Sequence, residues 1–187
     1  VKAVEFLMCC ESSSPSIGET IWYHPKNAWI REVYADAVKN RRVSGQISFN
    51  SKGGILADDM GLGKTLATLS LIRLTQKSAL EFPLPKGSSP ISQLKVPSTL
   101  VIAPLTTIES WMKEIKQHFT PGSLPFLLFH SNKKLSIGLS DVKKSAIVLV
   151  TYETLIMSTS KGKEDRKTKC LDLSELEWFR IVLDEAQ

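Results

Sequence analysis

A glycine-rich run in the first half of the chain has the residue types and spacing of a phosphate-binding loop. Residues 53–65 are Gly-Gly-Ile-Leu-Ala-Asp-Asp-Met-Gly-Leu-Gly-Lys-Thr. This pattern predicts a short apolar strand at Ile55–Ala57, then a tight turn, then the start of a helix. Backbone N–H groups in such a turn and at the helix start form a site for anionic oxygens. We expect Lys64 to reach the β- and γ-phosphates of a nucleotide and the Thr65 hydroxyl to hold Mg²⁺.

The match to the phosphate-loop signature is partial. The strict pattern has a glycine five residues before Gly63, and this chain has Asp58 there. The shorter match, Gly-x-Gly-Lys-Thr, leaves an ordinary glycine-rich turn with an exposed lysine as the alternative. The candidate nucleotide-binding residues are Asp58, Asp59, Met60, Gly61, Leu62, Gly63, Lys64 and Thr65.

Two adjacent acids near the end of the sequence could complete a hydrolytic site. Asp184 and Glu185 directly follow the apolar run Ile181–Leu183. Nucleotide hydrolysis needs a metal ion and an activated water molecule. Asp184 would hold Mg²⁺, often through a water, and Glu185 would orient or deprotonate the attacking water. A charge pair at a helix N-terminus is the alternative, but the phosphate loop upstream favours the catalytic interpretation. Lys64 and Glu185 are therefore the catalytic candidates.

Composition limits the class of protein. The chain has 187 residues, 42% hydrophobic and 23% charged, which suits one α/β domain with its own core. No apolar run approaches the roughly 18 residues that span a bilayer, and no signal peptide is evident. Cys9, Cys10 and Cys170 are expected to be reduced thiols of a cytosolic or nuclear protein. Neither these cysteines nor the scattered histidines have the spacing of a metal site made from protein ligands alone.

The net charge of +5 permits a polyanionic partner without demonstrating one. The basic residues are bunched in polar stretches, where solvated loops are the alternative to direct DNA contact. The bunches are Lys39, Arg41 and Arg42; Lys133, Lys134, Lys143 and Lys144; and Lys161, Lys163, Arg166, Lys167 and Lys169.

Hydrophobic periodicity predicts alternating strands and helices. Besides Ile55–Ala57, strands are expected at 99–103, 126–129, 146–150 and 179–183, and helices at 22–37, 65–75, 106–119 and 151–157. Thr106 with Glu109 fits a capping box for the third of these helices. We expect a loose leader over residues 1–21, one domain over 22–187, and inserts near 76–97 and 158–175.

Such an alternation predicts a parallel sheet with helices on both faces. Ligands of these sheets bind at the carboxyl ends of the strands. The phosphate loop, residues 104–106, residues 151–153 and residues 184–185 all follow predicted strands. We therefore expect them along one edge of the sheet.

These residues carry a family resemblance. The chain resembles the first RecA-like lobe of the SWI/SNF-type helicase-like ATPases of helicase superfamily two, over roughly residues 22–187. The subgroup with the helicase-like transcription factor and the fungal post-replication repair ATPases is the most similar. The blocks that resemble motifs I, Ia, Ib and II are Leu-Ala-Asp-Asp-Met-Gly-Leu-Gly-Lys-Thr (56–65), Leu-Val-Ile-Ala-Pro-Leu with Trp111 (100–111), Val-Leu-Val-Thr-Tyr-Glu-Thr-Leu (148–155) and the DEAH-like Val-Leu-Asp-Glu-Ala-Gln (182–187).

The resemblance implies a RecA-like nucleotide-binding fold that uses ATP and Mg²⁺. It also implies translocation along double-stranded DNA, on nucleosomes or at sites of DNA repair, in the nucleus and with no membrane partner. Family residues after motifs Ia and Ib touch the DNA backbone, which here implicates Thr106, Thr107, Thr151 and Tyr152. Helix capping is the alternative role for Thr106 and Thr151.

The chain departs from the family pattern in two places. Pro25 stands where the family has a glutamine that recognises adenine, which puts adenine selectivity in question. The sequence also stops inside motif II, so the second RecA-like lobe and its arginine finger lie outside it. Because such a finger contributes about 10³ to 10⁵ in rate, we expect weak Mg-ATP binding and negligible turnover from this chain alone. A truncated or degenerate, non-enzymatic nucleotide-binding or interaction module is the alternative function.

Overall fold

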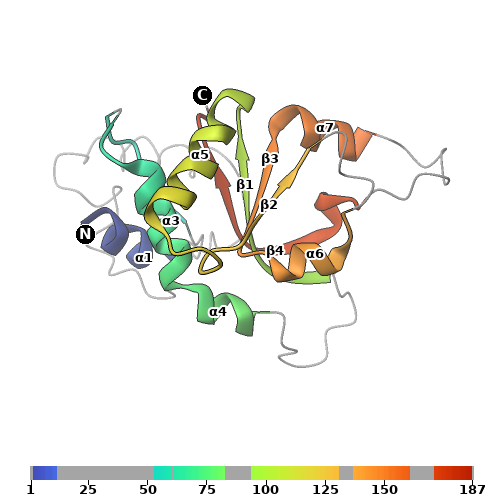
Figure 1. Ribbon diagram of the computed structural model, residues 1–187, viewed down its shortest axis with the longest axis horizontal. Coiled ribbons are helices and arrows are strands. Elements are labelled where there is room, and N and C mark those ends of the chain that lie inside the picture. The colour runs from blue at the N-terminus through green and yellow to red at the C-terminus, as the bar shows by residue number, and fades with distance from the viewer. Residues whose placement is uncertain are drawn as a thin grey trace, which may run out of the picture. The chain divides into compact units, whose positions relative to one another are not determined.

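The computed structural model describes residues 2–11, 53–59, 61–82, 94–130, 137–160 and 171–186 (Figure 1). The chain divides into two compact units, Val1–Ala67 and Thr68–Gln187. In the first unit, helix α1 (Lys2–Glu11) accepts a hydrogen bond at the Cys10 carbonyl from the Gly53 N–H, at 3.1 Å. Helix α3 (Lys64–Leu74) begins in the first unit and continues into the second.

The second unit is built on a four-stranded parallel sheet, which confirms the predicted α/β fold class. Its strands lie in the order β2-β3-β1-β4. The strand bounds are Leu94–Ala103 for β1, Phe126–Phe129 for β2, Ile147–Thr151 for β3 and Leu176–Leu183 for β4. The helical elements of this unit, besides the end of α3, are α4 (Gln76–Glu81), α5 (Leu105–His118), α6 (Leu139–Lys144), α7 (Tyr152–Ser160) and the 3₁₀ turn η3 (Leu173–Glu175).

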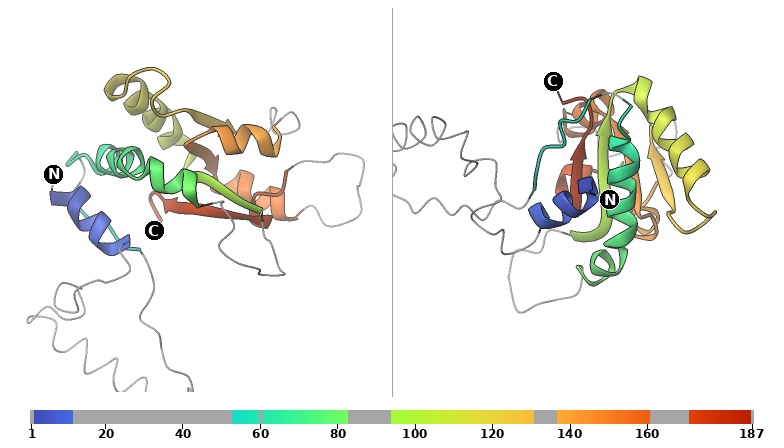
Figure 2. Two further views of the ribbon diagram at one scale, coloured as in Figure 1. Left: turned by 90° about the horizontal axis from the view of Figure 1, so that it is seen from below. Right: turned by 90° about the vertical axis from the view of Figure 1, so that its left-hand side faces the viewer.

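Helices cover both faces of the sheet (Figure 2). Successive strand residues point to opposite faces, so Val101 and Ala103 enter one hydrophobic cluster while Leu100 and Ile102 enter the other. Residues of α3 and α5 complete the first cluster. Residues of α6, α7 and η3 complete the second.

Handedness explains which helix covers which face. The connection from β1 to β2 through α5 runs across the sheet in one direction. The connections from β2 to β3 through α6, and from β3 to β4 through α7, run the opposite way. Because parallel crossovers are right-handed, reversing the direction moves the helix to the other face. Because all four strands are parallel, their carboxyl ends lie at one edge of the sheet.

Strand β1 begins earlier than the sequence pattern predicts, because Pro97 was taken as part of an insert. The pairing of β1 with β4 shifts register between Val96 and Thr99, which places Pro97 in a β-bulge. A bulge tolerates proline since the missing N–H is not needed by the ladder. The insert expected near 76–97 therefore contains helix α4 and the start of β1, and its residues 83–93 lie outside the described residues.

Three further expectations are corrected. The segment Ile55–Ala57 is not a strand: it is irregular, and Ile55 is 85% exposed. A strand requires a hydrogen-bonded neighbour, and none of the described strands pairs with this segment. Thr106 and Glu109 form no capping box, because α5 begins at Leu105 with Pro104 as its N-cap residue. Residues 2–11, expected to be a loose leader, form α1.

Most of the remaining predicted helices and strands within the described residues are present. The helices predicted at 65–75 and 151–157 are present as α3 and α7, and the strands at 126–129, 146–150 and 179–183 as β2, β3 and β4. The helix expected at 22–37, Pro25 and the basic stretch 161–170 lie outside the described residues. Among the described residues, no helix is both long and apolar enough to cross a membrane.

Candidate functional site

The glycine-rich loop turns tightly into helix α3, as predicted. Gly61 and Gly63 have φ values of 84° and 78°, a region that favours glycine over other residues. The first helical hydrogen bond runs from the Ala67 N–H to the Gly63 carbonyl at 2.8 Å. Lys64 and Thr65 are thus the first residues of the helix, where N–H groups lack intrahelical partners. Met60 lies outside the described residues.

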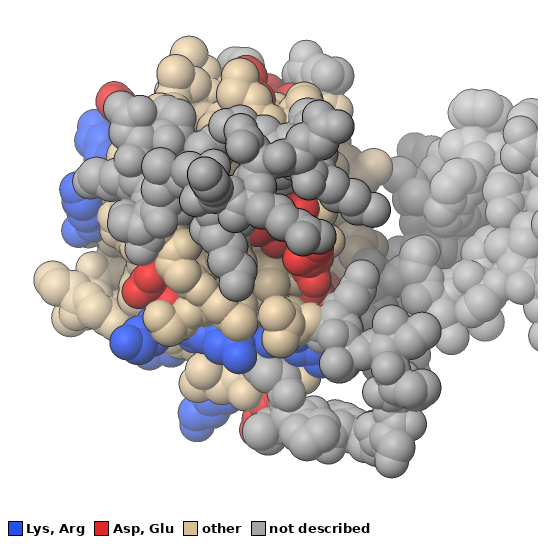
Figure 3. All heavy atoms as spheres, turned by 90° about the vertical axis from the view of Figure 1, so that its right-hand side faces the viewer, with Lys and Arg blue, Asp and Glu red and all other residues tan. Residues whose placement is uncertain are grey.

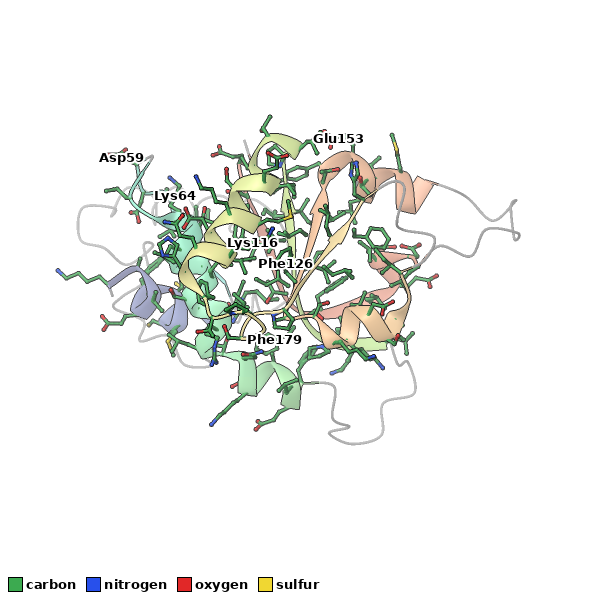
Figure 4. The ribbon with its side chains drawn as sticks, viewed as in Figure 1. Asp59, Lys64, Lys116, Phe126, Glu153 and Phe179 are labelled. Carbon is green, nitrogen blue, oxygen red and sulfur yellow. The ribbon has the colours of Figure 1, made fainter. Side chains whose placement is uncertain are left out.

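The Lys64 ammonium group folds back over the loop. Its Nζ donates to the carbonyl oxygens of Asp58 at 2.6 Å and Asp59 at 3.0 Å. Figure 4 labels Asp59 on the loop and Lys64 at the start of α3. The loop therefore holds a positive charge next to the N-terminus of α3, where helix N–H groups favour an anion, and in this structure that charge is bonded to two carbonyl oxygens.

In the second unit, the carboxyl ends of three neighbouring strands bring the other candidates together. Ala103 at the end of β1 pairs with Thr151 at the end of β3. The Asp184 N–H, just past β4, donates to the Ile102 carbonyl at 2.9 Å. The residues after β1, β3 and β4 therefore meet at one edge, as the sequence predicted for this part of the chain.

Asp184 is held by hydrogen bonds from three elements. Besides the bond to Ile102 in β1, its carboxylate Oδ2 accepts from the Trp111 indole Nε1–H of α5 at 2.8 Å. Its backbone carbonyl accepts from the Tyr152 hydroxyl of α7 at 2.8 Å. Among the described residues, the second carboxylate oxygen, Oδ1, makes no hydrogen bond. The aspartate is thus fixed in orientation while one oxygen stays available.

Glu185 leaves the strand in an uncommon conformation. Its φ of 49° is the only positive φ at a non-glycine position among the described residues. The left-handed region is costly for a residue with a Cβ, and such residues cluster at functional sites. Glu185 is also exposed, so its carboxylate can contact water.

The environment of Tyr152 favours its protonated form. Burial raises the pKa of the Tyr152 hydroxyl, and the negative charge of Asp184 raises it further. The phenol therefore remains a hydrogen-bond donor toward Asp184 at neutral pH.

The four threonine and tyrosine candidates for DNA contact differ in accessibility. Thr106 is exposed, whereas the Thr107 hydroxyl donates to the Pro104 carbonyl at 3.0 Å. Thr151 is 3% exposed, and its Oγ1 accepts from the Thr154 N–H at 3.2 Å, which is an N-cap bond for α7. The capping alternative is thus supported for Thr151 but not for Thr106.

Comparison with known proteins places the chain in a family. The model of the SNF2-related domain matches residues 1–187. The chain belongs to the SNF2-related domain family. This confirms the resemblance to SWI/SNF-type ATPases drawn from the motifs.

Named relatives of this SNF2-related domain include helicase-like proteins. An uncharacterized ATP-dependent helicase of Schizosaccharomyces pombe is 35% identical over 74% of this chain and 13% of its own length. A putative SWI/SNF-related matrix-associated actin-dependent regulator of chromatin, subfamily A member 3-like 1, of Arabidopsis thaliana is 31% identical over 72% of this chain and 18% of its own. The chain spans less than a fifth of these relatives.

A solved structure is also similar. It is the SWI2/SNF2 ATPase core of Sulfolobus solfataricus in complex with double-stranded DNA, 26% identical, covering 70% of this chain and 27% of that one with a TM-score of 0.42. That likeness is weak, and the fold of this SNF2-related domain is established by its own sheet and family match.

Sequence reasoning missed the contacts of Trp111 and Tyr152 with Asp184. In the sequence, Trp111 stands out only as part of the block that resembles motif Ia, and in the structure its side chain is 2% exposed in the core. A signal was present, because a buried indole N–H almost always has a hydrogen-bond partner. The partner itself is not local in sequence, so no spacing identifies it.

Of the basic clusters noted in the sequence, the structure describes Lys143 and Lys144. Lys143 and Lys144, in the last turn of α6, are exposed and make no ion pair with other described residues. Figure 3 faces the side of α6 and α7, and basic side chains gather along its lower part. Lys133, Lys134 and residues 161–169 lie outside the described ranges.

Proposed function

We propose that this SNF2-related domain is the ATP-binding lobe of a DNA-dependent ATPase. The parent protein would translocate on double-stranded DNA in chromatin remodelling or DNA repair, in the nucleus. The observation that carries the proposal is the loop, where Lys64 begins α3 and its Nζ lies 2.6 Å from the Asp58 carbonyl oxygen. Family membership supports it, as do relatives named DNA repair protein RAD5A and rad8.

The residues of the loop suit a nucleotide. Gly61 and Gly63 adopt positive φ, and a Cβ built on either would meet no atom of the described residues within 4 Å, so side chains of these residues do not crowd the two glycines. Phosphate oxygens carry more negative charge than carbonyl oxygens and make stronger hydrogen bonds with an ammonium group. Lys64 would therefore exchange its carbonyl partners for the β- and γ-phosphates when ATP binds.

The oxygen ligands suit Mg²⁺, which prefers carboxylate, hydroxyl and water oxygens together with nucleotide phosphates. We propose that Thr65 and Asp184 hold the ion. When bound, Mg²⁺ neutralises charge on the phosphates. Glu185 would orient or deprotonate the attacking water, since its carboxylate is exposed.

The candidate DNA contacts are sequence-independent in kind. Hydroxyl and backbone N–H groups bind phosphates and carry no base information. Thr106 is the side chain best placed for this role, because it is exposed at the carboxyl edge of the sheet. Thr107, Thr151 and Tyr152 would contribute through their backbone or after breaking an existing hydrogen bond.

The test is equilibrium binding of a fluorescent ATP analogue in the presence of Mg²⁺. We expect saturable binding by the chain and a loss of about 10-fold or more in Lys64→Ala, because the ammonium–phosphate contact is charge-assisted. The matched control is Lys77→Ala, which removes one positive charge from an exposed position in α4. Circular dichroism would establish that all samples are folded. Equal affinity of the Lys64 and Lys77 variants would refute nucleotide binding at this loop.

A further inference from the structure

We propose that Trp111 and Tyr152 are positioning residues that fix Asp184 for its metal-binding role. The inference rests on the proposed function. Its basis is that the carboxylate and the carbonyl of one aspartate each accept a hydrogen bond, at 2.8 Å, from side chains of two different helices.

The Trp111 bond determines which carboxylate oxygen faces the ligand. An N–H donated to an ionised carboxylate is stronger and more directional than one donated to a neutral acceptor. Because Oδ2 is engaged by the indole, rotation of the carboxylate is restricted, and Oδ1 is left without a hydrogen bond among the described residues. Partners of this kind set the orientation of metal ligands in other proteins.

The alternative is that the indole merely satisfies its own N–H. The chain contains a direct comparison, because Trp178 is also buried and its Nε1 donates to the Leu173 backbone carbonyl at 3.0 Å. A neutral carbonyl is thus sufficient for a buried indole in this same domain. Trp111 instead reaches a residue far away in sequence, and its acceptor is the acid that motif II places at the end of β4.

Tyr152 restrains the same residue through the backbone. Its hydroxyl donates to the Asp184 carbonyl, and the Asp184 N–H is bound to Ile102 of β1. The strand end is therefore held immediately before Glu185, where φ becomes positive. Holding both peptide groups of Asp184 limits how far the carboxylate can move.

The experiment measures the Mg²⁺-dependent part of nucleotide affinity. Binding of the fluorescent ATP analogue is titrated with Mg²⁺ and with EDTA, and the ratio of the two dissociation constants is compared among variants. We expect Trp111→Phe to reduce this ratio about 10-fold and Tyr152→Phe about 5-fold. Trp178→Phe is the matched control, since it removes a buried indole of the same size and N–H donor and should leave the ratio unchanged.

A second measurement tests the hydrogen bond itself. In ¹H–¹⁵N spectra of the indole groups, Asp184→Asn should shift the Trp111 resonance and leave that of Trp178 in place, because an amide oxygen is a weaker acceptor than a carboxylate. This readout uses the native tryptophans, so it remains decisive if Trp111→Phe fails to fold. Tyr152→Phe changes only a hydroxyl and provides the affinity comparison in that case.

The outcomes separate the two proposals. If the wild-type chain does not bind the analogue at all, the proposed nucleotide function fails, and if it binds without any Mg²⁺ dependence, the metal-binding role of Asp184 fails and the positioning role with it. If the affinity does depend on Mg²⁺, but Trp111→Phe and Tyr152→Phe keep the wild-type ratio, the positioning role fails alone. An unmoved Trp111 resonance in Asp184→Asn would also overturn it.

Discussion

The loop around Lys64 and the strand-end site around Asp184 are built in different ways. The loop depends on backbone conformation, with two glycines at positive φ and a lysine bonded to carbonyls five and six residues away. The strand-end site depends on side chains, and the two hydrogen bonds that side chains donate to Asp184 join residues 73 and 32 positions apart. A loop of the first kind is encoded locally, whereas a site of the second kind exists only after the sheet has formed.

Because the two sites are built differently, we expect substitutions in them to affect ligand affinity and folding stability to different degrees. Substitutions in the loop remove exposed or half-buried groups and should change ligand affinity more than folding. Substitutions at the strand end also remove parts of the core, since Trp111 belongs to the cluster beneath α5.

The largest expected effect is on folding, from Trp111→Ala. Removing a buried tryptophan leaves a cavity and an unpaired carboxylate, so we expect the free energy of unfolding to fall by about 3–5 kcal/mol. Urea denaturation would measure it. Lys116→Ala, an exposed change in the same helix, should cost less than about 0.5 kcal/mol. A loss below about 1 kcal/mol in Trp111→Ala would remove the contrast between the two regions.

Gly63→Ala tests the loop with a smaller effect on folding. An alanine at a φ of 78° is strained, which costs about 1–2 kcal/mol, and the distorted backbone should also weaken binding of the ATP analogue. Gly122→Ala is a matched control, because Gly122 has a φ of 81° and also has open space around it. Both variants should lose similar stability, but only Gly63→Ala should lose affinity. Equal affinities would mean that the loop backbone does not form the phosphate site.

The sequence predicted those parts of the fold whose signals are local. The strand Phe126–Phe129 was predicted with its observed bounds, because an apolar run between turn residues is sufficient to define it. Helices α4 and α6 were missed, since six residues show too little of the 3.6-residue period. The start of β1 was not predicted, because it contains Pro97 and proline usually interrupts strands. The pairing of β1 with β4 shifts register at this point, and that pairing cannot be read from the sequence of β1 alone.

The same limit applies to the candidate site. Lys64, Thr65, Asp184 and Glu185 were identified from motif spacing. Their individual roles stay predictions until binding is measured. The contact between Trp111 and Asp184 could not be predicted, because it depends on how α5 packs against the sheet and not on any spacing along the chain.

A pair of threonine variants tests which strand-end hydroxyls are structural. Thr151→Ala removes the N-cap bond of α7 and should cost about 1 kcal/mol of unfolding free energy. Thr106→Ala, at an exposed position, should change stability by less than about 0.5 kcal/mol but weaken binding to a labelled DNA duplex in fluorescence anisotropy. Unchanged DNA binding by Thr106→Ala would exclude a contact through its side chain.

The smallest expected effect is a change in the free energy of unfolding at alkaline pH, and it arises from the Tyr152 hydroxyl. Burial and the charge of Asp184 raise the pKa of its hydroxyl in the folded chain. The stability that this bond contributes is fully present below the unfolded-state pKa of about 10. Above that pH the unfolded chain releases the proton more readily than the folded chain, so the contribution falls as pH rises toward the folded-state pKa.

The stability difference between the wild type and Tyr152→Phe, measured by urea denaturation at increasing pH, should therefore narrow above about pH 10. Because other tyrosines titrate in both proteins, taking the difference cancels their effect. A difference that stays constant or widens would show that the hydroxyl is not held by Asp184, and the strand-end site would then be no more preorganised than the loop.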